Sequence, residues 1–183
     1  MTGAHLDNLQ ELSLFQPIQF LLGTTWFVIL PTVIGIAIIA REMKKREKRS
    51  ELRSIIGPAF TSYLLGIITA ALWLSWNDYH SISDTFQTRP PAEVSIWQVI
   101  ACGITLAICS ASLSKYRASR KGEAILFSLL LASGLSTVMS FGVSFGVGAQ
   151  EGVGVIFSFM GAFLVSAVFG LIAQATVKSD SPK

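Results

Sequence analysis

The sequence predicts an all-α, polytopic integral membrane protein: a bundle of five transmembrane helices with its N-terminus outside and its C-terminus in the cytoplasm. Three observations predict this fold: the apolar composition, five long stretches without charge, and the placement of the basic residues. Of the 183 residues, 51% are hydrophobic and only 14% are charged, and the mean hydropathy is +0.58. This balance leaves too little polar surface for a water-soluble globule.

The charged residues all lie outside five apolar stretches, which cover 12–40, 54–76, 94–114, 124–150 and 152–177. About 20 helical residues cross a hydrocarbon core about 30 Å thick, and every stretch reaches that length. A charged residue at the centre of such a helix costs about 2.5–3.5 kcal/mol on insertion scales. A membrane therefore explains why these stretches carry no charge.

Helices account for the stretches better than strands do. No stretch alternates polar and apolar residues over about ten positions, as the strands of a transmembrane barrel do. We therefore predict a single membrane domain over 1–183, with helices at about 15–40, 55–76, 95–114, 124–148 and 152–176.

The basic residues gather on one side of the predicted membrane. Segment 41–53 holds seven Lys and Arg residues, segment 115–122 holds four, and the C-terminal tail holds two, whereas the other side holds only Arg89. Cytoplasmic segments carry the excess of basic residues in membrane proteins. The sequence thus predicts a cytoplasmic loop at 41–53 and an outer loop at 77–94.

The first stretch is predicted to be a permanent span rather than a secretion signal. Asp7 and Glu11 precede it without any Lys or Arg, whereas a signal peptide begins with basic residues. Pro17 suits an early helical position, and Pro31, deep in the span, predicts a kink. The second helix is expected to begin near Gly57-Pro58.

Polar and small residues form one stripe on each of the third and fourth predicted helices. The stripe of the third helix comprises Gln98, Cys102, Thr105, Cys109 and Ser112. That of the fourth comprises Ser133, Thr137, Ser140, Ser144 and Gly148. In lipid, such residues turn toward other helices, so helix packing is the preferred interpretation and a hydrated path between the stripes is the alternative. The two cysteines cannot pair with each other, because seven helical residues separate their Cα atoms by about 10 Å.

The last two spans are rich in small residues. These residues are Gly142, Gly146, Gly148, Gly152, Gly154, Ser158 and Gly161. The GxxxG spacing predicts close helix packing, and the short connection predicts an antiparallel hairpin with Glu151 at its outer tip. A re-entrant loop that lines a pore is the alternative.

No residue pattern predicts catalysis, a cofactor or a metal. The predicted spans hold no ionisable Asp, Glu, Lys, Arg or His, and no H-E-x-x-H, C-x-x-C, G-x-S-x-G or phosphate-binding glycine loop occurs. His80, Asp78 and Asp84 are interpreted as solvated residues of the outer loop. A lipid-acting enzyme that uses His80 is the weakest alternative.

The basic segment is predicted to face the membrane surface. Anionic lipid headgroups attract each basic side chain by about 1 kcal/mol. The residues concerned are Lys44, Lys45, Arg46, Lys48 and Arg49. Because topology alone requires basic residues here, nucleic-acid binding is not predicted.

These features favour a non-catalytic accessory or assembly subunit of a larger protein complex in a bacterial cytoplasmic membrane, with other membrane subunits as partners. The alternative is a small homo-oligomeric transporter or channel, with a Ser/Thr-lined path between helices three and four.

Overall fold

A computed structural model describes residues 17–44, 52–74, 94–143 and 150–179. Within these ranges it contains six α-helices, one π-helix and no strand. The prediction of an all-α fold is therefore confirmed for the described residues. Four helices are long and apolar enough to cross a membrane: Ile55–Leu74, Ile96–Arg117, Lys121–Phe141 and Val153–Val177.

The first helical segment runs without a break through α2 (Pro17–Thr24), the π-helix η1 (Thr25–Ile29) and α3 (Leu30–Lys44). Pro31 lacks an N–H, and its ring would clash with the carbonyl of Phe27 in a regular α-helix. The turn that precedes Pro31 is a π-helix, in which the N–H of Leu30 bonds the carbonyl of Thr25. The hydroxyl of Thr32 also donates to the carbonyl of Val28, at 2.6 Å.

The second long helix, α4 (Leu52–Leu74), begins earlier than predicted. Pro58 was expected near its first residue but lies inside the helix. A proline there removes only one backbone bond, that to the carbonyl of Ser54. The hydroxyl of Ser62 donates to the carbonyl of Pro58 at 2.7 Å, and that of Thr61 donates to the carbonyl of Gly57 at 3.0 Å. The helix therefore continues through the Gly57-Pro58 pair.

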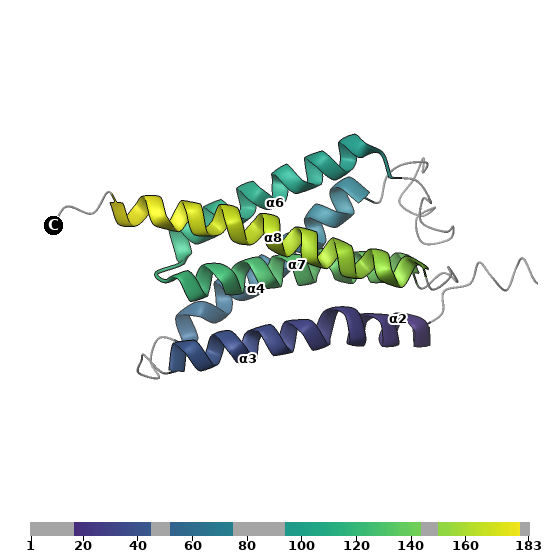
Figure 1. Cartoon of the computed structure of the whole chain (residues 1–183), viewed down its shortest axis with the longest axis horizontal. Helices are drawn as coiled ribbons and strands as arrows, with labels where there is room; N and C mark the ends of the chain where they lie inside the picture. The colour runs from purple at the N-terminus through teal and green to yellow at the C-terminus, as the bar shows by residue number, and fades with distance from the viewer. Residues whose placement is uncertain (1–16, 45–51, 75–93, 144–149, 180–183) are drawn as a thin grey trace, which may run out of the picture.

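The remaining helices are α6 (Ile96–Arg117), α7 (Lys121–Val143) and α8 (Gln150–Ser179). Successive segments alternate in direction, so that the end of α3, the start of α4, the α6–α7 turn and the end of α8 share one end of the bundle (Figure 1). Helices α7 and α8 pack against each other as antiparallel neighbours.

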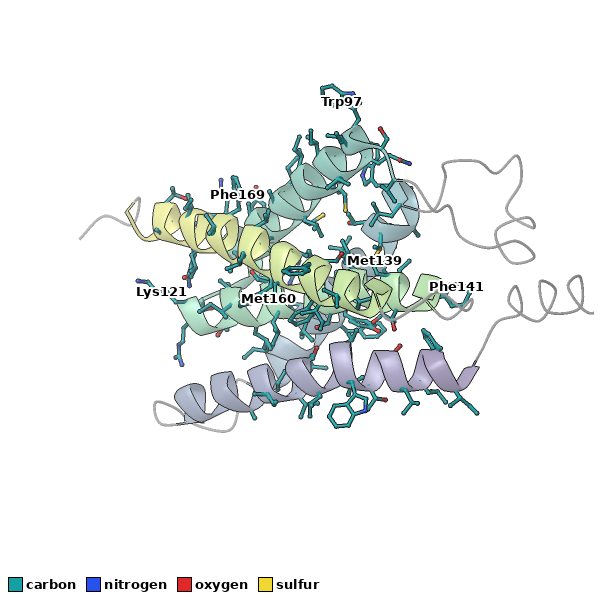
Figure 2. The ribbon with its side chains drawn as sticks, turned by 45° about the vertical axis from the view of Figure 1, so that its right-hand side comes forward. Trp97, Lys121, Met139, Phe141, Met160 and Phe169 are labelled. Atoms are coloured by element: carbon teal, nitrogen blue, oxygen red, sulfur yellow. The ribbon has the colours of Figure 1, made fainter. Side chains whose placement is uncertain are left out.

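Helix α7 is the centre of the bundle. It contacts the first helical segment, α4, α6 and α8, and 61% of its span is buried, against 22–28% for the other three candidate spans. Its residues Leu129, Leu131, Ala132 and Leu135 belong to the buried core, and Met139 packs against that core (Figure 2). Phe141 meets Phe20 of α2 edge to face, with ring centroids 6.0 Å apart.

Large apolar side chains cover the outside of the other helices. Trp97 at the start of α6 is 77% exposed and points away from the bundle (Figure 2). Exposed Val, Ile, Leu and Phe side chains line α6, α8 and the first segment. An apolar exterior around a partly polar interior suits a hydrocarbon solvent.

Candidate functional site

The polar stripe of α7 forms hydrogen bonds to two neighbouring segments, the first helical segment and α4. The hydroxyls of Thr32 and Ser133 are 2.6 Å apart, joining α3 to α7. Those of Thr24 and Ser140 are 3.0 Å apart, joining α2 to α7. The phenol of Tyr63 in α4 lies 3.1 Å from the hydroxyl of Thr137. In membrane proteins an interhelical bond of this kind contributes about 0.6 kcal/mol on average and up to about 1.7 kcal/mol. The stripe thus links the first helical segment and α4 to the central helix.

Members of the polar stripe of α6 contact α4, the buried core and the first turn of α6 itself. The indole N–H of Trp73 donates to the hydroxyl of Thr105 at 3.0 Å, which joins α4 to α6. Cys102 is buried in the core, and Cys109 packs against it; both thiols are free. The side-chain oxygen of Gln98 accepts the N–H of Ser95 at 2.9 Å, which caps the first turn of α6.

Among the described residues, the hydrogen bonds of the two stripes therefore lead to other segments and not from one stripe to the other. The hydrogen bonds of Ser133, Thr137 and Ser140 lead to the first segment and α4, and that of Thr105 also leads to α4. Ser112 of the α6 stripe is exposed. Ser144 and Gly148 of the α7 stripe lie outside the described residues.

The closest helix contact lies where α4 crosses α7, at Gly66 and Gly134. A Cβ atom on Gly66 would collide with the carbonyl of Leu131 and lie 2.9 Å from the backbone nitrogen of Leu135. A Cβ atom on Gly134 would collide with the carbonyl of Tyr63 and lie 3.0 Å from the backbone nitrogen of Ile67. This pair was not predicted from the sequence, because neither glycine belongs to a GxxxG motif.

Two of the predicted packing glycines face outward. A Cβ atom on Gly154 or Gly161 of α8 would meet no described atom within 4 Å, and both residues are exposed. Gly142 is the penultimate residue of α7, and Gly146 lies outside the described residues. A packing role for these four glycines remains a prediction.

A third polar group, which was not predicted from the sequence, lies between α6, α7 and α8. We call it the Gly170 cluster. Its members surround Gly170 or share its face of α8: Ser110, Ser114, Ser128, Ser166, Gly170 and Gln174. The hydroxyl of Ser110 donates to the carbonyl of Ser166 at 2.6 Å and lies 3.2 Å from the hydroxyl of Ser128. The four-residue spacings of Ser110 and Ser114, and of Ser166, Gly170 and Gln174, were the available sequence signal.

Glu123 is the one charged residue buried among those that the structure describes, with 5% of its surface exposed. It lies in the first turn of α7, where its carboxylate accepts the N–H of Ser119 at 2.7 Å. An acidic side chain at this place bonds a free backbone donor and complements the helix dipole. Glu123 thus has a capping role that accounts for its burial.

The remaining predicted sites are mostly outside the described ranges. Lys44 is the last residue of α3, and its side chain is not described. Lys45, Arg46, Lys48, Arg49 and the outer loop with Asp78, His80 and Asp84 lie outside. Their predicted roles stay predictions.

Comparison of the chain with protein-family models, curated proteins and solved structures gives no match.

Proposed function

We propose that the chain crosses a bacterial cytoplasmic membrane five times, with its N-terminus outside. The fifth crossing, in addition to the four candidate spans, is the first helical segment. This segment is continuous from Pro17 to Lys44 and is therefore about 40 Å long at 1.5 Å per residue. The alternating directions of the segments support the count, since α3 ends at the same end of the bundle as the α6–α7 turn (Figure 1). Basic residues are concentrated at that end, which supports its cytoplasmic placement.

Single cysteines test this orientation. In a chain with Cys102 and Cys109 replaced by alanine, we expect a membrane-impermeant maleimide to label Glu151→Cys on intact cells. Lys44→Cys should react only after permeabilisation. Labelling of Lys44→Cys on intact cells, or protection of Glu151→Cys, would contradict the orientation, whatever the function of the protein.

We further propose that the protein is a non-catalytic accessory or assembly subunit of a larger membrane complex. The observation that carries this proposal is the outward placement of Gly154 and Gly161, seven residues apart on α8. Two turns of helix separate them, so they lie on nearly the same face. In lipid, small residues on one helix face allow the backbone of another helix to approach closely. The outer face of α8 therefore suits a transmembrane helix of another subunit.

The interior of the bundle supports packing rather than transport. The hydroxyls of Thr32 and Ser133, and those of Tyr63 and Thr137, are within hydrogen-bond distance of each other. Hydroxyls engaged in this way join helices and offer less to a passing solute. This observation favours the accessory subunit over a path between the two stripes.

Affinity purification in a mild detergent tests the proposal. We expect a stoichiometric larger membrane protein to co-purify with the tagged chain. The double substitution Gly154→Leu and Gly161→Leu should reduce its recovery several-fold, because the new side chains fill the contact face. Gly103→Leu is the matched control, since a Cβ on Gly103 of α6 likewise meets no described atom within 4 Å.

Two results would contradict the proposal. One is a tagged chain that purifies alone or only with copies of itself. The other is a partner whose recovery is unchanged by the α8 double substitution, which would remove the argument from the outward glycines.

A further inference from the structure

The Gly170 cluster contains buried polar atoms that lack a protein partner. Ser114 and Ser166 have no exposed surface, and Gln174 is 5% exposed. The hydroxyls of both serines and the amide nitrogen of Gln174 form no hydrogen bond to any part of the chain that the structure describes. A buried polar group without a partner costs about 1–3 kcal/mol, so three of them in one junction require an explanation.

These groups converge on the same face of α8. The hydroxyl oxygens of Ser114 and Ser110 lie 2.7 and 2.8 Å from the point where a Cβ of Gly170 would stand. Gln174 lies one turn beyond Gly170, and a helical side chain leans toward the preceding turn, here that of Gly170. Gln174 therefore lies on the same face of α8 as Gly170, which the hydroxyl of Ser114 approaches from α6.

The hydrogen-bond count shows which chemistry this region needs. The hydroxyl of Ser110 donates to the carbonyl of Ser166, at 2.6 Å, and that of Ser128 donates to the carbonyl of Ala124, at 2.9 Å. The hydroxyls of Ser110 and Ser128 also lie 3.2 Å from each other. Each hydroxyl has one proton, which it donates to a carbonyl, so no proton remains for the contact between the two oxygens. The hydroxyl oxygens of Ser110 and Ser128 therefore keep unused lone pairs. In the same cluster, the protons of the Ser114 and Ser166 hydroxyls and of the Gln174 amide are unused. The missing partner must therefore accept hydrogen bonds, and the spare lone pairs allow it to donate them as well.

A neutral partner fits the cluster better than an ion. Hydroxyl and amide groups line it, and its six residues include no charged side chain. An ion buried without a counter-charge loses tens of kcal/mol of solvation, whereas fixing one water molecule costs at most about 2 kcal/mol. We propose that the Gly170 cluster is a binding site for ordered water, which hydrogen-bonds Ser114 and Gln174 and so links α6 to α8.

Ser114→Ala tests the site, with Ser112→Ala as the matched control because Ser112 is exposed on the same helix. If water is bound, Ser114→Ala removes one of its partners. The midpoint of thermal unfolding in detergent should then fall by roughly 3–8 °C, while Ser112→Ala changes it little. If the hydroxyl has no partner at all, its removal should leave the midpoint unchanged or raise it, and the proposal is overturned.

Two measurements on the unsubstituted protein complete the test. An experimental map that resolves ordered solvent should show density at about 2.7–3.2 Å from the hydroxyl oxygen of Ser114. A well-defined junction without such density would overturn the proposal. The second measurement compares the unfolding midpoint in sodium chloride and in sodium gluconate at equal ionic strength. A higher midpoint in chloride that Ser114→Ala abolishes would identify a bound anion and would overturn the proposal.

Discussion

Gly66→Ala is expected to prevent α4 and α7 from packing, with a loss of about 3 kcal/mol or more in the free energy of unfolding, the upper range for overpacking. The added methyl group collides with the carbonyl of Leu131 and lies 2.9 Å from the backbone nitrogen of Leu135. Backbone atoms cannot rotate away, so the two helices must separate. Gly134→Ala should behave in the same way, since its methyl group meets the carbonyl of Tyr63 across the same crossing.

The matched control is Gly57→Ala in the same helix, where a Cβ meets no atom within 4 Å among the described residues. Alanine favours a helix over glycine by up to about 1 kcal/mol, so this variant should be as stable as the natural protein or more stable. Thermal unfolding can be followed by the reaction of Cys102, which is 5% exposed, with a fluorescent maleimide. Equal unfolding midpoints for Gly57→Ala and Gly66→Ala would contradict the close backbone contact between α4 and α7 at Gly66.

Gly170→Ala is the substitution with the second largest expected effect, about 1–3 kcal/mol. Its methyl group would lie 2.7 Å from the hydroxyl oxygen of Ser114 and 2.8 Å from that of Ser110. A serine hydroxyl can rotate, which makes the clash less costly than one with backbone. The rotation of Ser110 nevertheless breaks its bond to the carbonyl of Ser166.

A double-mutant cycle isolates this contact. Adding Ser114→Ala to Gly170→Ala removes one of the two crowded oxygens, so the pair should lose less stability than the two single variants summed. Gly154→Ala on the outer face of α8 is the control and should have little effect. Simple additivity of the two substitutions would contradict the contact between Ser114 and Gly170.

Helix type and approximate helix position could be predicted from the sequence because they depend on long neutral stretches. Five stretches without charge predict helices of membrane length, and the described chain has helices in all five. The second helix was predicted at about 55–76, with its beginning near Gly57-Pro58, whereas α4 begins at Leu52. A proline disturbs a helix only at the bond to the residue four positions earlier, so it does not have to mark a helix end.

The candidate site was harder to predict because composition does not say which neighbour a polar side chain meets. The hydroxyls of Ser133 and Thr137 were identified as contact residues, but not their partners Thr32 and Tyr63. Gly154 and Gly161 were grouped with the packing residues and lie on the outer surface of α8. Gly66, Gly134 and the Gly170 cluster were not identified at all.

By itself, the sequence determined that the chain consists of apolar helices, because each charged residue placed in hydrocarbon carries its own free-energy cost. Only the tertiary structure decided that α7 is the enclosed helix, that Gly66 meets Gly134, and that Ser114 faces Gly170. These facts depend on how the helices rotate and cross. In lipid, apolar faces are almost equivalent, so close fit and hydrogen bonding between particular small residues choose the arrangement.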